Sequence, residues 1–241
     1  MTRLSVNLNK VALIRNSRGE NLPDLVQVAR DCEAFGAQGI TVHPRPDQRH
    51  ARYDDIPQLK EVVTTELNVE GNPIPEFMDL VLKHRPHQCT LVPDAPDAMT
   101  SSTGWNTVKF HDFLADICQQ LREAGIRSSI FVDPVPAYVE GAHTAGADRI
   151  EFYTGHFARQ FAHDPTAAVR HHVLCAGIAH ELGLGVNAGH DLNLENLRFY
   201  VTEVPHVDEV SIGHALISDA LYYGLENTIQ MYLQCLVDYA E

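Results

Sequence analysis

The chain has 241 residues, of which 44% are hydrophobic, and this length and composition suit one α/β barrel with a sizeable core. Its 32 acidic residues outnumber its 18 Lys and Arg, and the resulting net charge of −14 argues against nucleic acid or an anionic membrane as a partner. No apolar signal segment opens the chain and no run of about 18 apolar residues follows, so we expect a cytosolic protein without a membrane anchor.

A repeated unit organises the chain, in which a helix-like stretch ends at Gly and a short apolar run follows. Apolar residues recur at helical spacing before these points, for example over 25–34 and 110–121. Gly supplies the left-handed conformation that ends a helix. The Gly residues concerned are Gly36, Gly125, Gly146 and Gly183. The apolar runs, interpreted as buried strands, fall near residues 4–9, 39–44, 67–71, 88–93, 127–133, 149–154, 185–190 and 209–214.

Strands that alternate with helices predict a parallel sheet, and the number of units predicts that it closes. The predicted fold class is therefore α/β, a single (β/α)8 TIM barrel with extra short helices that forms one catalytic domain over residues 1–241. An open, doubly wound sheet is the main alternative, which the even strand count and the length disfavour. Neither G-x-G-x-x-G nor G-x-x-x-x-G-K-[ST] occurs, so the sequence gives no support to a nucleotide site of those kinds.

The cysteines indicate no cross-link. They are odd in number, widely scattered and without a C-x-x-C pair, which fits neither a disulfide framework nor a structural zinc site. We expect reduced, mostly buried thiols at Cys32, Cys89, Cys118, Cys175 and Cys235.

Polar side chains cluster where the predicted strands end. Barrel active sites form at the carboxyl ends of the strands and in the loops that follow them. Each of these residues alone is explained equally well as a hydrogen-bonded structural residue, but their joint placement predicts one site. The residues are Asn7 and Asn9, His43 with Arg45 and His50, Glu70, Glu151, His190 and His214.

Gly213 marks a predicted phosphate site, because the last strand passes through it directly into a helix whose first backbone N–H groups are able to hold an anion. The loop that carries Asp191 forms the other wall. Arg18, Arg45 and His50 are candidates for a second anion site through charge-assisted hydrogen bonds, the alternative being solvated loop charges.

The 14 histidines raise the question of a metal. The adjacent pair His171 and His172 points in two directions on a helix, and His43-x-Arg45 lacks the H-x-H spacing of metal-dependent hydrolase barrels. We therefore predict metal-free acid–base catalysis by His and Glu.

An ordered set of motifs over the whole chain resembles the pyridoxine 5'-phosphate synthase family. The motifs are Ser5-Val6-Asn7-Leu8-Asn9-Lys10, Arg15-Asn16-Ser17-Arg18-Gly19, Gly39-Ile40-Thr41-Val42-His43-x-Arg45 with Arg49-His50, Leu67-Asn68-Val69-Glu70, Leu91-Val92-Pro93, Thr100, Ile150-Glu151 with Thr154-Gly155, Val186-Asn187-Ala188-Gly189-His190 and Ser211-Ile212-Gly213-His214-Ala215.

The resemblance implies condensation of 3-amino-2-oxopropyl phosphate with 1-deoxy-D-xylulose 5-phosphate to pyridoxine 5'-phosphate, phosphate and water, without cofactor or metal. It makes His43 and Glu70 proton acceptors, His190 a proton donor and Glu151 a stabiliser of charged intermediates. It assigns the amino-ketone phosphate to Asn7, Arg18, Asp191, Gly213 and His214, and the deoxyxylulose phosphate to Arg45, His50 and Thr100 with Asn9 and Lys10 beside it. Thr100 belongs to a polar stretch, 94–104, that is expected to close as a lid.

The sequence departs from the family motif at two places. Asn9-Lys10 replaces Asp-His, which exchanges a carboxylate for an amide and a titratable ring for a long cation. Asp191 stands where Gly is frequent, so its carboxylate must turn away from a bound phosphate.

The alternatives are another phosphosugar barrel enzyme, such as an isomerase, epimerase or aldolase, and a phosphate-ligand sensor without catalysis. The resemblance also implies a homo-oligomer, an octamer built from dimers.

Overall fold

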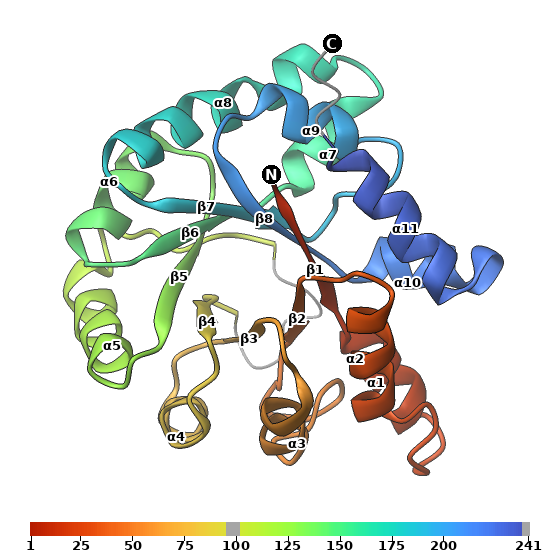
Figure 1. Cartoon of the computed structure of the whole chain (residues 1–241). Coiled ribbons are helices and arrows are strands. Elements are labelled where there is room, and N and C mark those ends of the chain that lie inside the picture. Colours follow the sequence, from red (N-terminus) through yellow and green to blue (C-terminus); the bar gives the residue numbers. More distant parts are fainter. Residues whose placement is uncertain (95–101, 238–241) are drawn as a thin grey trace.

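Parallel strands form the centre of the computed structural model, which describes residues 1–94 and 102–237, and helices surround them (Figure 1). The strands are β1 (Arg3–Asn7), β2 (Gly39–Val42), β3 (Leu67–Gly71), β4 (Gln88–Leu91), β5 (Arg127–Val132), β6 (Arg149–Phe152), β7 (Gly185–Gly189) and β8 (Val207–Ile212). They fall where the apolar runs predicted them, with every end displaced by two residues at most.

The sheet closes on itself. Ser5 of β1 pairs with Gly39 of β2 on one side and with Ser211 of β8 on the other, so the first and last strands are neighbours. No strand of the sheet is left at an edge, since all eight form one ring. The predicted barrel is confirmed, and the open doubly wound sheet is excluded.

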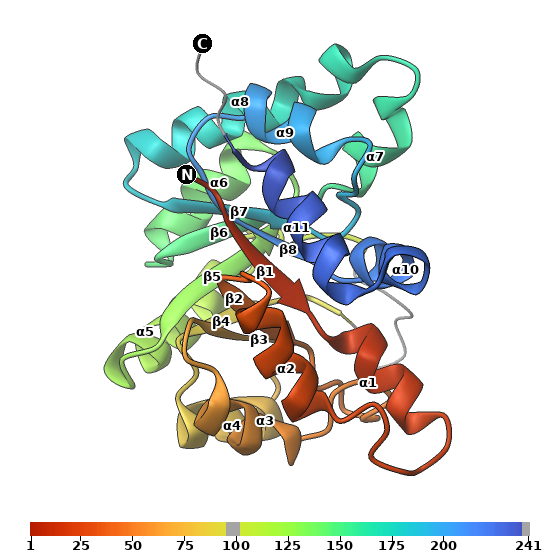
Figure 2. The same ribbon diagram turned by 45° about the vertical axis from the view of Figure 1, so that its right-hand side comes forward.

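The helices connect successive strands around the outside of the barrel. They are α1 (Asn9–Asn16), α2 (Leu25–Ala34), α3 (Asp55–Val62), α4 (Pro75–His84), α5 (His111–Glu123), α6 (Pro136–Thr144), α7 (Gly155–Phe161), α8 (Pro165–Glu181), α9 (Leu197–Glu203), α10 (His214–Tyr223) and α11 (Leu225–Cys235). After β1, β6 and β8 two helices follow where one would complete the unit, which confirms the extra short helices. Figure 2 shows α1 and α10 at the end of the barrel toward which β1 points.

The predicted glycine stops are confirmed. Gly36, Gly125, Gly146 and Gly183 all have positive φ, between 74° and 102°. Residues other than glycine pay a steric cost in this region, so glycine is the residue that allows each helix to turn immediately into the next strand.

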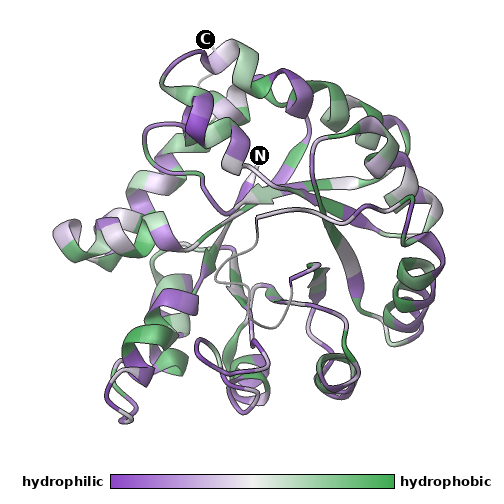
Figure 3. Cartoon of the chain, turned by 180° about the vertical axis from the view of Figure 1, so that it is seen from behind, coloured by the Kyte–Doolittle hydropathy of each residue, from purple (hydrophilic) through white to green (hydrophobic). Residues whose placement is uncertain are grey.

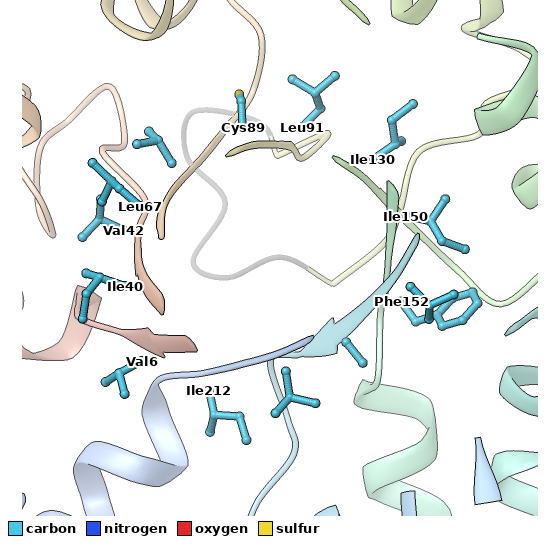
Figure 4. Packing of buried hydrophobic residues seen from close by; sticks show 14 of the residues in the cluster. Val6, Ile40, Val42, Leu67, Cys89, Leu91, Ile130, Ile150, Phe152 and Ile212 are labelled. Carbon is cyan, nitrogen blue, oxygen red and sulfur yellow. The ribbon is translucent and has the colours of Figure 1, made fainter. Parts of the chain in front are cut away.

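Side chains alternate along the strands, and most of the apolar ones face outward; Phe131 on β5 instead belongs to a separate buried cluster with Val92 and Tyr153. Figure 4 shows these outer side chains between strands and helices, pointing away from the barrel centre, and Figure 3 shows hydrophobic and hydrophilic residues mixed along the strands. On β1, for example, Leu4 and Val6 belong to the hydrophobic core, whereas Ser5 faces Thr41 of β2. Most barrels fill the interior with Val, Ile and Leu. Here the apolar core is instead a shell between the sheet and the helices.

The barrel interior is held by hydrogen bonds between side chains. The hydroxyls of Ser5 and Thr41 lie 2.8 Å apart, the Asn68 amide donates to Thr41 at 3.3 Å, and Thr90 donates to Asn68 at 3.0 Å. Buried polar groups that are paired in this way avoid the free-energy penalty of desolvation. A barrel of this kind accommodates polar residues along its axis below the strand ends.

The remaining sequence expectations concern thiols and membranes. All five cysteines are free and four are buried, which confirms the mostly buried thiols. Among the residues described, no helix is both long and apolar enough to cross a membrane.

Candidate active site

A cavity of about 480 Å³ opens at the carboxyl end of the barrel strands. Twelve of the fourteen predicted site residues line it, from six strands or the loops that follow them: Asn7, Asn9, Lys10, His43, Arg45, His50, Glu70, Glu151, His190, Asp191, Gly213 and His214. The fold thus brings together residues that are as far as 207 positions apart in the chain, from Asn7 to His214.

Two predicted residues are not among those lining the cavity. Arg18 is exposed in the turn that follows α1 and does not reach the cavity of its own chain. Thr100 lies outside the described residues, as does most of the proposed lid.

Glu70 and His43 form the centre of the site. The His43 Nδ1 atom lies 3.9 Å from Glu70 Oε2, and the Asn7 amide donates a hydrogen bond of 3.3 Å to the same carboxylate oxygen. Asn9 accepts from the His43 backbone N–H at 2.8 Å, while its own N–H donates to Asn7 Oδ1 at 3.0 Å. Asn9, which stands where the family motif has Asp, therefore connects the start of α1 to the backbone that follows β2.

The protonation of this pair suits proton transfer near neutral pH. Burial raises the pKa of Glu70 to about 7, against the lowering effect of the nearby His190. Burial, followed by the positive charge of Arg45, lowers the pKa of His43 well below its usual range. At neutral pH His43 is therefore neutral, and Glu70 is divided between carboxylate and acid.

Glu151 lies deeper, on β6, and is almost completely buried. Burial and the negative charges of Glu70 and Glu209 raise the pKa of Glu151 well above its ordinary value. Its Oε2 atom has no hydrogen-bond partner among the described residues. A protonated carboxyl in this position is able to donate a hydrogen bond to negative charge that develops above it.

A group of cations lies on the side of the cavity formed by α1 and the loop after β2. Burial, then the charges of Lys10 and Arg45, lower the pKa of His50 to about 4, so its ring is neutral at pH 7. Arg45 donates to Asp94 at 2.8 Å, with both side chains buried. Lys10 and Arg45 therefore bring positive charge to this side of the cavity, and Asp94 offsets part of it.

The start of α10 forms another wall of the cavity. Gly213 precedes this helix, and a Cβ atom there would lie 3.0 Å from Asn7 Cβ, so glycine permits the close approach of β8 and β1. No described side chain caps the helix. The first backbone N–H groups, at His214 and Ala215, lie beside the cavity in an arrangement that favours an anion.

A buried ion pair supports the loop that carries His50. Arg15 makes two hydrogen bonds to the carboxylate of Asp55, at 2.6 and 2.9 Å. The neighbouring Asn16 donates to the carbonyls of Gln48, Arg49 and His50 at 3.2, 3.0 and 2.8 Å. The end of α1 thereby holds the backbone on both sides of His50.

Several residues at the site were not predicted from the sequence. Asn193, Ser211 and Ala215 line the cavity, and Asp94 binds Arg45. Ser211 was recognisable, because it lies two residues before Gly213 and side chains of a strand alternate between its faces. Asn193 and Asp94 lie in loops, whose course the sequence pattern does not define.

The described residues contain no group of three or more His, Cys, Asp and Glu side chains that could together hold a metal ion.

The fold is shared with phosphate-handling enzymes of low sequence identity. A 3-keto-L-gulonate-6-phosphate decarboxylase from Vibrio cholerae superposes with a TM-score of 0.67 at 10% identity, over 98% of this chain and 97% of that one. A thiamine phosphate pyrophosphorylase from Pyrococcus furiosus gives 0.62 at 14% identity, over 97% and 95%. At this level of identity the similarity shows the barrel alone.

Relatives of high identity carry a single name. The chain is 59% identical to the pyridoxine 5'-phosphate synthase of Cytophaga hutchinsonii, over 97% of this chain and 98% of that protein. It is 57% identical to the enzymes of the same name from Christiangramia forsetii and Bacteroides fragilis, over 98% of this chain and 100% of each relative. The model of the family described as pyridoxal phosphate biosynthesis protein PdxJ matches residues 4–238. This protein belongs to that family.

Proposed function

We propose that this protein condenses 3-amino-2-oxopropyl phosphate with 1-deoxy-D-xylulose 5-phosphate and releases pyridoxine 5'-phosphate, phosphate and water. The relatives that share more than half of its sequence are named for this product. The observation that carries the proposal is that one cavity holds a carboxylate whose pKa is about 7, a histidine whose pKa is lowered (His43) and a histidine whose pKa is raised (His190).

The reaction joins an amine to a ketone, expels water and phosphate, and closes a ring, so protons must be both removed and supplied. Glu70 is the main proton acceptor, with neutral His43 beside it. His190, whose pKa is raised, is the proton donor. Glu151, protonated at the floor of the cavity, donates a hydrogen bond to negative charge in the intermediates.

Two phosphorylated substrates need two anion sites, and the cavity offers two separate groups of donors. The amino-ketone phosphate binds at the start of α10, near Gly213 and His214, with Asn7 as a further ligand. Arg18, which the family resemblance also assigns to this phosphate, does not reach the cavity of its own chain. The deoxyxylulose phosphate binds near Arg45 and His50, where Lys10 adds positive charge and Asn9 and Thr100 add hydrogen bonds. Arg45 must then exchange its bond with Asp94 for one with the substrate.

The test is to incubate the purified, chelator-treated protein with both substrates and to measure pyridoxine 5'-phosphate and released phosphate. Mixtures that lack either substrate serve as controls. Product that requires both substrates supports the proposal. Turnover of one substrate alone would favour a phosphosugar isomerase, epimerase or aldolase, and binding of both without turnover would favour a sensor.

The pH dependence follows from Glu70. A proton acceptor must be ionised to act, and burial raises the pKa of Glu70 to about 7. We expect kcat/KM to rise with pH through a limb centred near 7 and to fall again where the proton donor ionises. Rates measured between about pH 5.5 and 9 at constant ionic strength check this. A rising limb near 4.5, the ordinary value for Glu, would contradict it.

We also propose that the protein forms homo-oligomers, as the family resemblance implies, and acts in the cytoplasm. Exposed apolar side chains support the proposed homo-oligomer. Leu221 and Tyr222 at the end of α10 are 76% and 85% exposed, and Leu13 and Ile14 are exposed on the adjacent α1.

A further inference from the structure

His190 and Asp191 form a close pair at the end of β7. The His190 Nδ1 atom lies 2.7 Å from Asp191 Oδ2, although the two residues are neighbours in the chain. His190 adopts a φ of +33°, a backbone conformation that a side chain other than that of glycine rarely adopts. This turn of the backbone is what brings the imidazole back toward the following carboxylate.

The pair is held from both sides. The Asp191 N–H points to Thr154 Oγ1 at 3.3 Å, and the Thr154 hydroxyl donates to the Gly189 carbonyl at 2.6 Å. Gly189 in turn lies so close to β8 that an added Cβ atom would be 2.0 Å from the Ser211 carbonyl oxygen. The backbone on both sides of His190 is therefore fixed by its neighbours, although the two side chains themselves are 32% and 37% exposed.

We propose that Asp191 is a positioning residue that acts through His190: it orients the imidazole, fixes the proton on Nδ1 and keeps the ring protonated, so that Nε2 delivers the proton in the reaction. This inference rests on the proposed function, in which His190 is the proton donor. It also gives Asp191 a role different from the phosphate contact that the family resemblance implied.

The charges around the pair support this assignment. Burial, the largest single influence, lowers the pKa of His190, but the hydrogen bond and charge of Asp191, together with other carboxylates, raise it overall. Glu70 on β3 and Asp94 after β4 add to the increase. Burial raises the pKa of Asp191, and the hydrogen bond and charge of His190 reverse this, so that it is lowered.

Residues on other elements also influence the ionisation of His190 and Asp191. His43, which follows β2, is a neutral ring within electrostatic reach of His190, and Tyr153 packs its ring edge-on against the His190 imidazole, with the ring centres 6.1 Å apart. Arg159 on α7 and His214 on α10 favour the ionised form of Asp191. The carboxylate is thus neutralised by His190 and its neighbours, which allows an anion in the phosphate site that begins at Gly213. A glycine at position 191 would supply neither the charge nor the hydrogen bond.

A proton donor acts while it is protonated, so activity falls as pH rises through the pKa of His190. Because Asp191 raises this pKa, its removal moves the falling limb of the pH profile to lower pH. Asp191→Asn keeps an oxygen that accepts from Nδ1 and removes only the charge, whereas Asp191→Gly removes both.

The experiment follows the protonation of His190 directly. Histidine labelled with ¹³C at Cε1 is incorporated into the whole protein, and the His190 signal is identified as the one that disappears in His190→Gln. Its titration is compared in the wild type, Asp191→Asn, Asp191→Gly and Glu195→Gln. The last variant removes one negative charge from an exposed side chain of the same loop and serves as the matched control.

We expect a lower titration midpoint for His190 in both Asp191 variants and an unchanged one in Glu195→Gln. In the assay, kcat at pH 8 should fall about tenfold in Asp191→Asn and further in Asp191→Gly, with a smaller loss at pH 6. A midpoint that does not move in Asp191→Asn would overturn the proposal. The titration needs no turnover, so it decides the role of Asp191 even if the two substrates give no product.

Discussion

Replacement of Glu70 by Gln is expected to lower kcat about 10²- to 10⁴-fold, the range in which a positioned proton acceptor contributes to catalysis. Glutamine has nearly the same shape and keeps an oxygen that accepts from the Asn7 amide. Glutamine cannot accept a proton, however. Among the residues described, neutral His43 is the other proton acceptor at this place, 3.9 Å from the Glu70 carboxylate of the wild type. The rising limb of the pH profile near 7 should disappear together with the activity.

Steady-state rates for both substrates and a thermal unfolding curve are the measurements. Glu61→Gln, which makes the same change at an exposed position on α3, is the matched control and should retain wild-type rates. An unchanged unfolding temperature would show that the loss lies in the chemistry. If Glu70→Gln keeps a kcat within about threefold of wild type, Glu70 is not the proton acceptor.

Replacement of Arg15 by Met should destabilise the protein by about 3–5 kcal/mol. Arg15 is one of the largest fully buried side chains, and its guanidinium makes two hydrogen bonds to Asp55. Methionine fills part of the space but leaves the Asp55 carboxylate buried without its cation. Breaking one partner of a buried pair is costly because the remaining charge stays desolvated.

Urea unfolding at a fixed protein concentration measures this loss. The double variant Arg15→Met/Asp55→Leu removes both charges and should recover most of the stability. The single variant Asp55→Leu completes the comparison. If the double variant lost as much stability as Arg15→Met and Asp55→Leu added together, the two residues would not be a coupled pair. Because the end of α1 also supports the loop of His50 through Asn16, Arg15→Met should weaken binding of the deoxyxylulose phosphate as well.

Local sequence patterns predicted the framework because they report short-range physics. Glycine with positive φ ends a helix wherever it stands, so Gly36 and Gly146 marked strand starts reliably. The predicted strand near 209–214 begins two residues earlier, at Val207, because the polar residues Asp208 and Glu209 conceal its start in the sequence. The pairing of β8 with β7 shifts register at this point, from Val186 opposite Val207 to Asn187 opposite Glu209. The helix pattern that included Phe110 and Phe113 is confirmed as α5, but both rings are partly exposed beside Trp105.

The site residues that lie at strand ends were predictable from the sequence, because the strand ends themselves were predictable. His43, Glu70 and Gly213 follow directly from the ends of β2, β3 and β8, and parallel strands in a ring bring their carboxyl ends to one place. Arg18 shows the limit of this reasoning. It lies in a turn, no strand end fixes its position, and it is exposed, away from the cavity of its own chain.

By itself the sequence determined the order of strands and helices, the closure of the barrel and the group of residues at its mouth, because each depends on local periodicity and on the geometry of parallel strands. Only the tertiary structure decided the protonation and the pairing of these residues. The raised pKa of Glu70 and Glu151 comes from burial, and the hold of Asn16 on the loop of His50 comes from contact between segments distant in the chain. Desolvation and hydrogen bonding depend on three-dimensional surroundings, which no short stretch of sequence contains.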